Sequence, residues 1–276
     1  MQFNKKILKD MARLCSLSYK KQNEMNGLFG IRPFCNNDYP LYLCKNIPKL
    51  HSSSGNNDCQ VYTTLYDNKF VAVFRGTESG RDVLTDLNMA RMPMDLDNIE
   101  KNKRPWVHWG FLRQFRTVDK KINIALKEYV NNKEIEDKDK NIIFCGHSLG
   151  GALSSLACLE FSQKYKDSKI PIHSITFGSP RVGSKYFAKL FNNNVQTSYR
   201  FVNDNDPVPL MPTPLRYSHV DGCVWLYEDL VLNETSVWRW WRFIRNSILS
   251  FTGNTYNPLI DHKCNSYITD LDNLEF

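Results

Sequence analysis

The strongest constraint on the fold of this chain is the segment GHSLGG at residues 146–151, between an apolar run and a helix-forming stretch. Residues 142–145 (IIFC) have the character of a buried strand, and residues 152–161 favour a helix. Glycines on both sides of Ser148 relieve crowding in a tight turn, so its hydroxyl can stand exposed at the end of the strand. The following helix would present backbone N–H groups to a developing oxyanion. The segment therefore predicts a nucleophilic serine.

The rest of the chain alternates between strand-like and helix-like segments. Strands are expected at residues 61–65, 70–74, 142–145, 175–178, 198–202 and 223–226, and helices at residues 3–20, 111–129, 152–161 and 186–191. Such alternation indicates a mostly parallel sheet with helices on both faces. The expected fold class is therefore α/β.

A length of 276 residues suits one large domain, and we expect a single domain over residues 1–276. Within it, residues 1–60 should form an N-terminal helix followed by an irregular extension rich in Pro, Asn and Ser. Residues 78–106 carry several Met and Leu side chains and form a candidate lid. A permanently packed surface helix is the alternative for this segment.

Residues 233–255 form a candidate amphipathic insertion rich in aromatic side chains. Residues 237–251 place Trp241, Ile244 and Ile248 on one helical face, with three arginines interleaved. This composition suits the headgroup region of a membrane, so peripheral contact with a lipid surface is one interpretation. A helix packed on the protein is the other.

Charge and cysteine patterns exclude several classes of function. The formal net charge is +7, but the basic residues are scattered and form no stripe, which argues against nucleic-acid binding. The eight cysteines have no zinc-ligand spacing, so no metal site is expected. Charged residues interrupt the first twenty positions, and no segment is apolar enough to span a bilayer. These features predict a cytoplasmic protein.

A serine nucleophile needs a histidine base and a carboxylate that orients it. Asp206 precedes Pro207 in a stiff loop after an expected strand and is the favoured acid, with Asp204 as its competitor. Of the six histidines, His262 and His219 remain as candidate bases. His262 follows the last expected strand, as a base on a terminal loop should.

Seven short strings in this order resemble the class 3 lipases, the α/β-hydrolase family of fungal triacylglycerol lipases and plant phospholipases A1. They are VFRGT (73–77), DVLTDL (82–87), VHWGF (107–111), GHSLGGA (146–152), TFGSPRVG (176–183), NDPVP (205–209) and DH (261–262). Two positions depart from the family pattern: Val83 stands where tryptophan is common, and Ser179 where glutamine is common. These changes affect the expected lid base and loop packing and leave the catalytic residues unchanged.

The resemblance implies a catalytic triad of Ser148, Asp206 and His262. It also implies an oxyanion hole formed by Thr77 and the backbone N–H of Leu149. His219 matches a non-catalytic position of the family. The implied activity is that of a serine carboxylester hydrolase acting on lipid esters through an acyl-enzyme, with no metal or organic cofactor. The alternative is a catalytically silent, lipase-like module that binds lipid or has a regulatory role.

Overall fold

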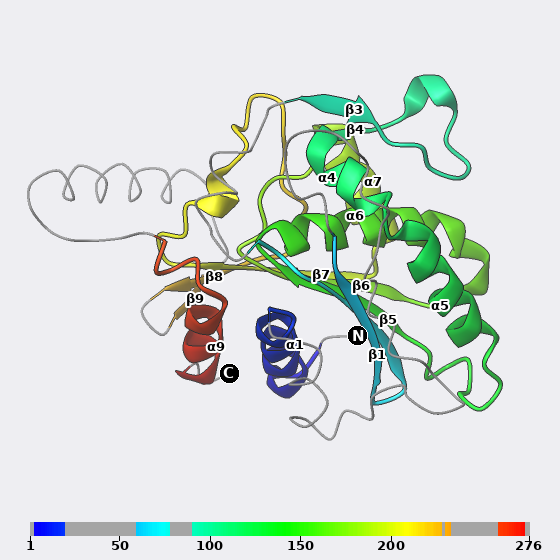
Figure 1. Cartoon of the computed structure of the whole chain (residues 1–276), viewed down its shortest axis with the longest axis horizontal. Helices are drawn as coiled ribbons and strands as arrows, with labels where there is room; N and C mark the ends of the chain where they lie inside the picture. The colour runs from blue at the N-terminus through cyan, green and yellow to red at the C-terminus, as the bar shows by residue number, and fades with distance from the viewer. Residues whose placement is uncertain (1–2, 20–58, 78–89, 228–229, 233–258, 274–276) are drawn as a thin grey trace, which may run out of the picture.

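A seven-stranded sheet runs through the computed structural model, which describes residues 3–19, 59–77, 90–227, 230–232 and 259–273 (Figure 1). The strand order is β1-β2-β5-β6-β7-β8-β9. Its strands are β1 (Val61–Tyr66), β2 (Lys69–Phe74), β5 (Ile142–His147), β6 (Ile172–Phe177), β7 (Thr197–Asn203), β8 (Cys223–Tyr227) and β9 (Leu230–Leu232). Within this sheet β2, β5, β6, β7 and β8 pair in parallel, whereas β1 and β9 pair antiparallel at the edges. The mostly parallel α/β sheet predicted from the sequence is confirmed.

Helices cover both faces of the sheet (Figure 1). Helices α4, α5, α6 and α7 lie on one face, and α1 and α9 lie on the other. The helices are α1 (Lys5–Leu17), α4 (Trp109–Phe115), α5 (Asp119–Asn131), α6 (Leu149–Lys164), α7 (Lys185–Asn194) and α9 (Cys264–Asn273). The described residues also form the short 3-10 helices η1 (Lys101–Lys103), η2 (Lys166–Ser168) and η3 (Val208–Leu210).

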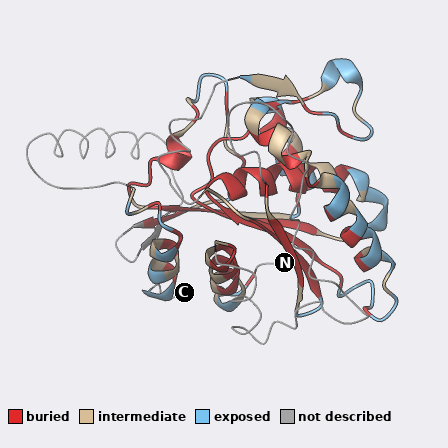
Figure 2. Ribbon diagram, in the orientation of Figure 1, coloured by how far each residue is buried: buried red, intermediate tan, exposed pale blue. Residues whose placement is uncertain are grey.

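The central strands are apolar at successive positions because both of their faces are buried (Figure 2). In β5, Ile142 and Phe144 join the core beneath α4 to α7, whereas Ile143 and Cys145 join the core beneath α1 and α9. The period of two residues along a strand produces this division. The sheet thus separates two apolar cores and holds the end of β5 rigidly.

The segment predicted as one helix over residues 111–129 is instead two helices, α4 and α5. The Thr117 hydroxyl donates a hydrogen bond to the Gln114 carbonyl in the turn between them. Arg116 contacts both Asp119 and Glu160 from the same turn. A side chain that bonds the local backbone competes with helix continuation, which accounts for the break.

Helix α9 and strand β9 were absent from the sequence-based prediction. Helix α9 lies beside α1, where Lys9 and Asp272 form an ion pair at 2.7 Å and Ser16 contacts Asn265 at 2.9 Å. These contacts hold α1 and α9 side by side beneath the sheet (Figure 1). The position of α9 matters because the candidate base His262 directly precedes it.

The aromatic insertion and the first part of the candidate lid, residues 78–89, lie outside the described residues. Of the lid, the structure describes residues 90–106, which contain η1 and the strand β3 (Arg91–Pro93), paired antiparallel with β4 (Trp106–His108). Met94 and Leu96 are buried in the core with α4 and α6. The insertion at residues 233–255 and the extension at residues 20–58 lie outside the described part. Among the helices the structure does describe, none could traverse a bilayer.

Candidate active site

Ser148 occupies a strained turn between β5 and α6. Its backbone has φ 59° and ψ −128°, a conformation that residues other than glycine rarely adopt. The Ser148 N–H donates to the Phe177 carbonyl of β6 at 2.9 Å, which fixes the turn to the sheet. A Cβ atom at Gly150 would lie 2.1 Å from the Phe74 carbonyl oxygen, so only glycine permits this approach. The local sequence therefore folds into the sharp turn that its glycines predicted.

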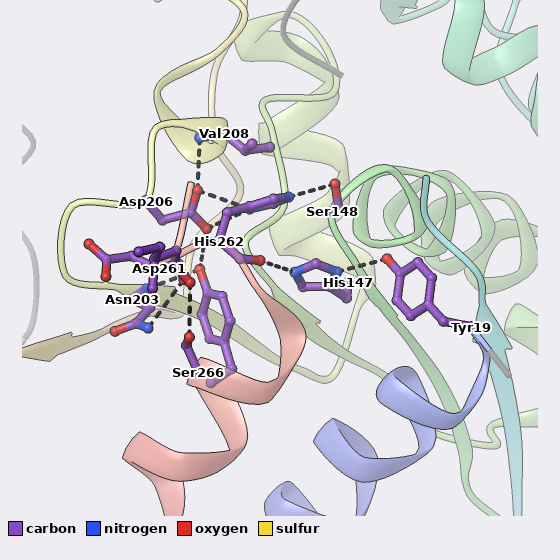
Figure 3. A network of polar contacts seen from close by, with 11 residues as sticks. Tyr19, His147, Ser148, Asn203, Asp206, Val208, Asp261, His262 and Ser266 are labelled. Carbon is purple, nitrogen blue, oxygen red and sulfur yellow. Dashed lines mark hydrogen bonds and ion pairs between the residues drawn. The ribbon is translucent and has the colours of Figure 1, made fainter. Parts of the chain in front are cut away.

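Ser148, His262 and Asp206 form a continuous chain of hydrogen bonds at the carboxyl edge of the parallel strands (Figure 3). The Ser148 Oγ lies 2.8 Å from Nε2 of His262. The other ring nitrogen of His262, Nδ1, lies 2.8 and 3.0 Å from the two Asp206 carboxylate oxygens. The structure thus brings together three residues that are 114 and 56 positions apart in sequence. This arrangement allows the imidazole to take a proton from the serine and the carboxylate to stabilise the resulting charge.

Asp206 is completely buried, and its surroundings keep it ionised. Burial alone would raise the pKa of this carboxyl group, but the His262 charge and hydrogen bonds from His262, Tyr267 and the Val208 N–H hold the pKa below its usual value. The Tyr267 hydroxyl donates to Oδ2 at 2.5 Å, and the Val208 N–H donates to Oδ1 at 2.9 Å. The carboxylate is therefore available as a negative charge beside the imidazole.

The turn after β6 leaves no room for a side chain at position 178. Gly178, at the end of β6, has φ 59°, and a Cβ there would lie 2.7 Å from Asp206 Oδ2 and 3.0 Å from His262 Nδ1. The backbone N–H of Asn203 donates to the Tyr267 hydroxyl at 3.0 Å, which orients that hydroxyl toward Asp206. Glycine at position 178 and the tyrosine together shape the acid's pocket.

The competing acid, Asp204, lies outside this hydrogen-bond chain. Its backbone N–H donates to the Leu226 carbonyl at 2.9 Å, and its carboxylate accepts from the Asn205 side chain at 2.5 Å. The structure therefore favours Asp206 over Asp204, the choice that the sequence left open.

The remaining described histidines have other surroundings. His219 Nε2 contacts the Pro209 carbonyl at 2.7 Å, whereas the Ser148 hydroxyl contacts His262. His173 contacts Asn141 at 3.0 Å within the sheet, and His108 accepts from the Phe111 N–H at the start of α4. In the part of the chain covered by the structure, no group of three or more His, Cys, Asp or Glu side chains is arranged to hold a metal ion.

The predicted oxyanion groups flank the serine turn. A Cβ at Gly76 would lie 3.3 Å from Ser148 Cβ, so the turn carrying Thr77 lies against the nucleophile. Within the described residues, the Thr77 Oγ1 is buried and has no hydrogen-bond partner. Leu149 is the first residue of α6, where helix N–H groups lack partners within the helix. A buried hydroxyl without a partner is costly, and an oxyanion would satisfy it.

Sequence reasoning missed three polar residues that lie around the triad: Tyr19, Asn203 and Tyr267. The spacing of Cys264, Tyr267, Ile268 and Leu271 is that of an amphipathic helix and could have revealed α9. No local pattern could have revealed Tyr19, because it contacts His147 across 128 residues of sequence.

A central parallel sheet, a serine on a strand-to-helix turn and a Ser-His-Asp hydrogen-bond chain define an α/β-hydrolase. The family model for class 3 lipases matches residues 71–215, which is more than half of the chain. The chain belongs to the class 3 lipase family. The family resemblance drawn from the sequence is thereby confirmed.

Two curated relatives and one solved structure illustrate the similarity. A secreted mono- and diacylglycerol lipase of Fusarium solani is 31% identical over 57% of this chain and 44% of the relative. A chloroplastic phospholipase A(1) of Arabidopsis thaliana is 28% identical over 51% of this chain and 33% of the relative. The chain thus spans less than half the length of these two relatives.

The fold is similar to that of a Rhizopus microsporus lipase crystal structure. The TM-score is 0.60, with 24% identity over 82% of this chain and 76% of the lipase. At this level of identity the likeness concerns the fold.

The prediction of a cytoplasmic protein is contradicted by the relatives. Lipases from Fusarium solani, Malassezia globosa and Penicillium cyclopium that match this chain are all named as secreted. The prediction relied on charged residues in the first twenty positions. Export is decided by targeting segments that need not belong to the folded domain, so this composition was a poor guide to location.

Proposed function

We propose that the chain is a serine carboxylester hydrolase that acts on lipid esters, of the triacylglycerol lipase or phospholipase A1 type. The observation that carries this proposal is the chain of hydrogen bonds from Ser148 through His262 to Asp206. Membership of the class 3 lipase family and the names of its relatives support the choice of lipid esters.

The reaction follows from the positions of the three side chains. His262 Nε2 takes the proton of the Ser148 hydroxyl as Oγ attacks the ester carbonyl carbon, and Asp206 stabilises the imidazolium that forms. The carbonyl oxygen becomes an oxyanion, which accepts hydrogen bonds from the Thr77 hydroxyl and the Leu149 N–H in this proposal. Collapse of this intermediate expels the alcohol, which receives the proton from His262.

Deacylation repeats these steps with water. His262 removes a proton from a water molecule, which attacks the acyl-enzyme carbonyl. The second tetrahedral intermediate collapses, the fatty acid leaves, and the proton returns to Ser148. No side chain is consumed in the cycle.

Hydrolysis of p-nitrophenyl esters of increasing acyl length tests this proposal. We expect turnover by the unmodified chain, and a loss of at least about 1000-fold in Ser148→Ala, because the nucleophile is removed. Ser154→Ala is the matched control: Ser154 is also buried, but its hydroxyl donates to the Gly151 carbonyl within α6. This control should retain turnover within about threefold.

The same assay tests contact with lipid surfaces when anionic phospholipid vesicles are added. Higher turnover of long-chain esters at the vesicle surface would support a lipase or phospholipase that works at an interface. Equal turnover of esters by wild type and Ser148→Ala would refute the proposed enzyme and favour a silent lipid-binding module.

A further inference from the structure

Both ring nitrogens of His147, the residue before the nucleophile, have specific partners. Nδ1 lies 2.8 Å from the Tyr19 hydroxyl, and Nε2 lies 2.6 Å from the backbone carbonyl oxygen of His262 (Figure 3). The ring is buried and packs against the His262 ring at a centroid distance of 4.7 Å. His147 therefore contacts the base residue itself, through its main chain.

The partners determine which nitrogen of His147 carries the proton. Burial and then the nearby His262 ring lower the pKa of His147 to about 3, so the ring is neutral near neutral pH. A carbonyl oxygen only accepts, so Nε2–H must donate to the His262 carbonyl. Nδ1 must then accept from the Tyr19 hydroxyl, which stays protonated because burial raises the pKa of Tyr19. The His262 carbonyl thus fixes the tautomer of His147, and Tyr19 supplies the donor that this tautomer requires at Nδ1.

A neutral His147 also suits catalysis. During the reaction His262 becomes an imidazolium, and a second positive charge on a ring 4.7 Å away would oppose that step. The neutral N–H donor orients the His262 main chain without adding this repulsion.

The His262 carbonyl belongs to a short turn that needs external support. Residues 259–263 form turns and a bend between the end of the undescribed insertion and α9. On one side, the Asn203 side chain donates to the Asp261 carbonyl at 3.2 Å. On the other side, His147 donates to the His262 carbonyl. These two bonds hold consecutive carbonyl groups of the turn that carries the base.

Tyr19 connects this support to the N-terminal helix and to the oxyanion turn. It lies two residues beyond α1, and its ring lies beneath the Arg75 guanidinium at 5.8 Å. A Cβ at Gly76 would lie 2.4 Å from the Tyr19 hydroxyl, so that turn packs directly on it. One hydroxyl group therefore touches both the support of the base and the turn that precedes Thr77.

We propose that Tyr19 and His147 form a positioning pair, which holds the turn of the base through the His262 carbonyl and couples α1 to the triad. Neither side chain reaches the reacting atoms, so the pair acts through His262. This inference rests on the proposed hydrolase function for its kinetic consequences, while its structural consequence can be measured without turnover.

The kinetic test compares Tyr19→Phe with Tyr66→Phe. The Tyr66 hydroxyl also bonds α1, through Asp10, but lies away from the triad. We expect Tyr19→Phe to lower kcat for a soluble ester by about 10-fold with little change in KM, because small misplacements of a catalytic base are costly. Tyr66→Phe should keep kcat within about twofold even if α1 is less stable. Equal kcat in Tyr19→Phe and wild type would overturn the proposal.

Substitutions of His147 separate hydrogen bonding from packing. Gln can both donate to the His262 carbonyl and accept from Tyr19, whereas Leu fills similar space and does neither. We expect His147→Gln to retain most of kcat and His147→Leu to lose about 10-fold or more. In the His147→Leu background, Tyr19→Phe should cause no further loss, because Tyr19 acts through His147. Fully multiplicative losses would contradict the pair.

Hydrogen exchange provides the readout that does not depend on activity. The Ser266 N–H donates to the Lys263 carbonyl, and the Lys263 N–H donates to the Ile260 carbonyl. We expect these amides to exchange roughly 5-fold faster in Tyr19→Phe than in wild type or Tyr66→Phe, as one support of the turn is lost. Unchanged exchange would refute the pair even in a chain without esterase activity. Absence of Ser148-dependent turnover with faster exchange would refute only the proposed function.

Discussion

At the scale of single residues, Ser148 combines a chemical role with a conformational cost. A positive φ at a residue with a side chain costs on the order of 1–3 kcal/mol, and surrounding structure must compensate for it. Here the compensation comes from the bond to Phe177 in β6 and from the packing of Gly150 against β2. The hydroxyl is thereby aimed at His262.

This strain predicts an unusual order of stability. Ser148→Gly should be more stable than Ser148→Ala by about 1 kcal/mol, since glycine adopts the positive φ without penalty. At Ser154, in the middle of α6, the order should be reversed, with alanine more stable by about 1 kcal/mol. Urea unfolding of the four variants measures both differences. Alanine more stable than glycine at position 148 as well would show that the turn carries no strain.

At the scale of elements, the hydrogen-bond chain of Ser148, His262 and Asp206 has contacts with helices to which none of the three residues belongs. Tyr267 of helix α9 donates a hydrogen bond to Asp206, and Tyr19, just after α1, contacts His147. These helices pack side by side on the face of the sheet opposite α6 (Figure 1). The site is therefore supported from both faces of the sheet.

Weaker packing of α1 on the sheet should disturb the site at a lower temperature than the one at which the whole domain unfolds. Met11 is completely buried between α1 and the sheet, so Met11→Ala should lower the free energy of unfolding by about 2–5 kcal/mol. The exposed Lys6 gives the control Lys6→Ala, with an expected change below about 0.5 kcal/mol. Thermal unfolding together with esterase activity checks this. We expect activity to fall at a lower temperature than the global transition in Met11→Ala, and coincident transitions would argue against local uncoupling.

At the scale of the whole molecule, buried histidines link stability to pH. Burial lowers the pKa of His173 to about 4 and that of His147 to about 3, whereas an unfolded histidine titrates near about 6.5. Between these values the unfolded chain binds protons that the folded chain does not. Stability must therefore fall as pH decreases through this window. The lowered pKa of Asp206 acts in the same direction at still lower pH, where protonation removes its bond to His262.

The pH dependence of unfolding tests this linkage. From pH 6 to pH 4 we expect each of the two histidines to contribute a slope approaching about 1.4 kcal/mol per pH unit. His147→Gln should remove its share of that slope and leave the stability near pH 8 less affected. Urea unfolding at several pH values provides the measurement. An unchanged slope in His147→Gln would mean that this ring is protonated in the folded chain.

Much of the scaffold could be predicted because its signals are local. The buried strands are continuous apolar runs, and the glycines around Ser148 allow the sharp turn between strand and helix. Seven short strings in order were enough to indicate the family. Predictions failed where local preference was ambiguous, as in the break between α4 and α5. The prediction of a cytoplasmic location was wrong because folding patterns carry little information about export.

The sequence by itself determined the α/β fold, the family, the serine turn and the candidates for acid and base, since each depends on residue types at short spacings. The tertiary structure favours Asp206 over Asp204 and His262 over His219, because only it brings distant loops to one edge of the sheet. It alone revealed Tyr19 and Tyr267 as supports of the triad. Hydrogen bonds depend on distance in space, and separations of 61 to 128 residues leave no trace in local sequence pattern.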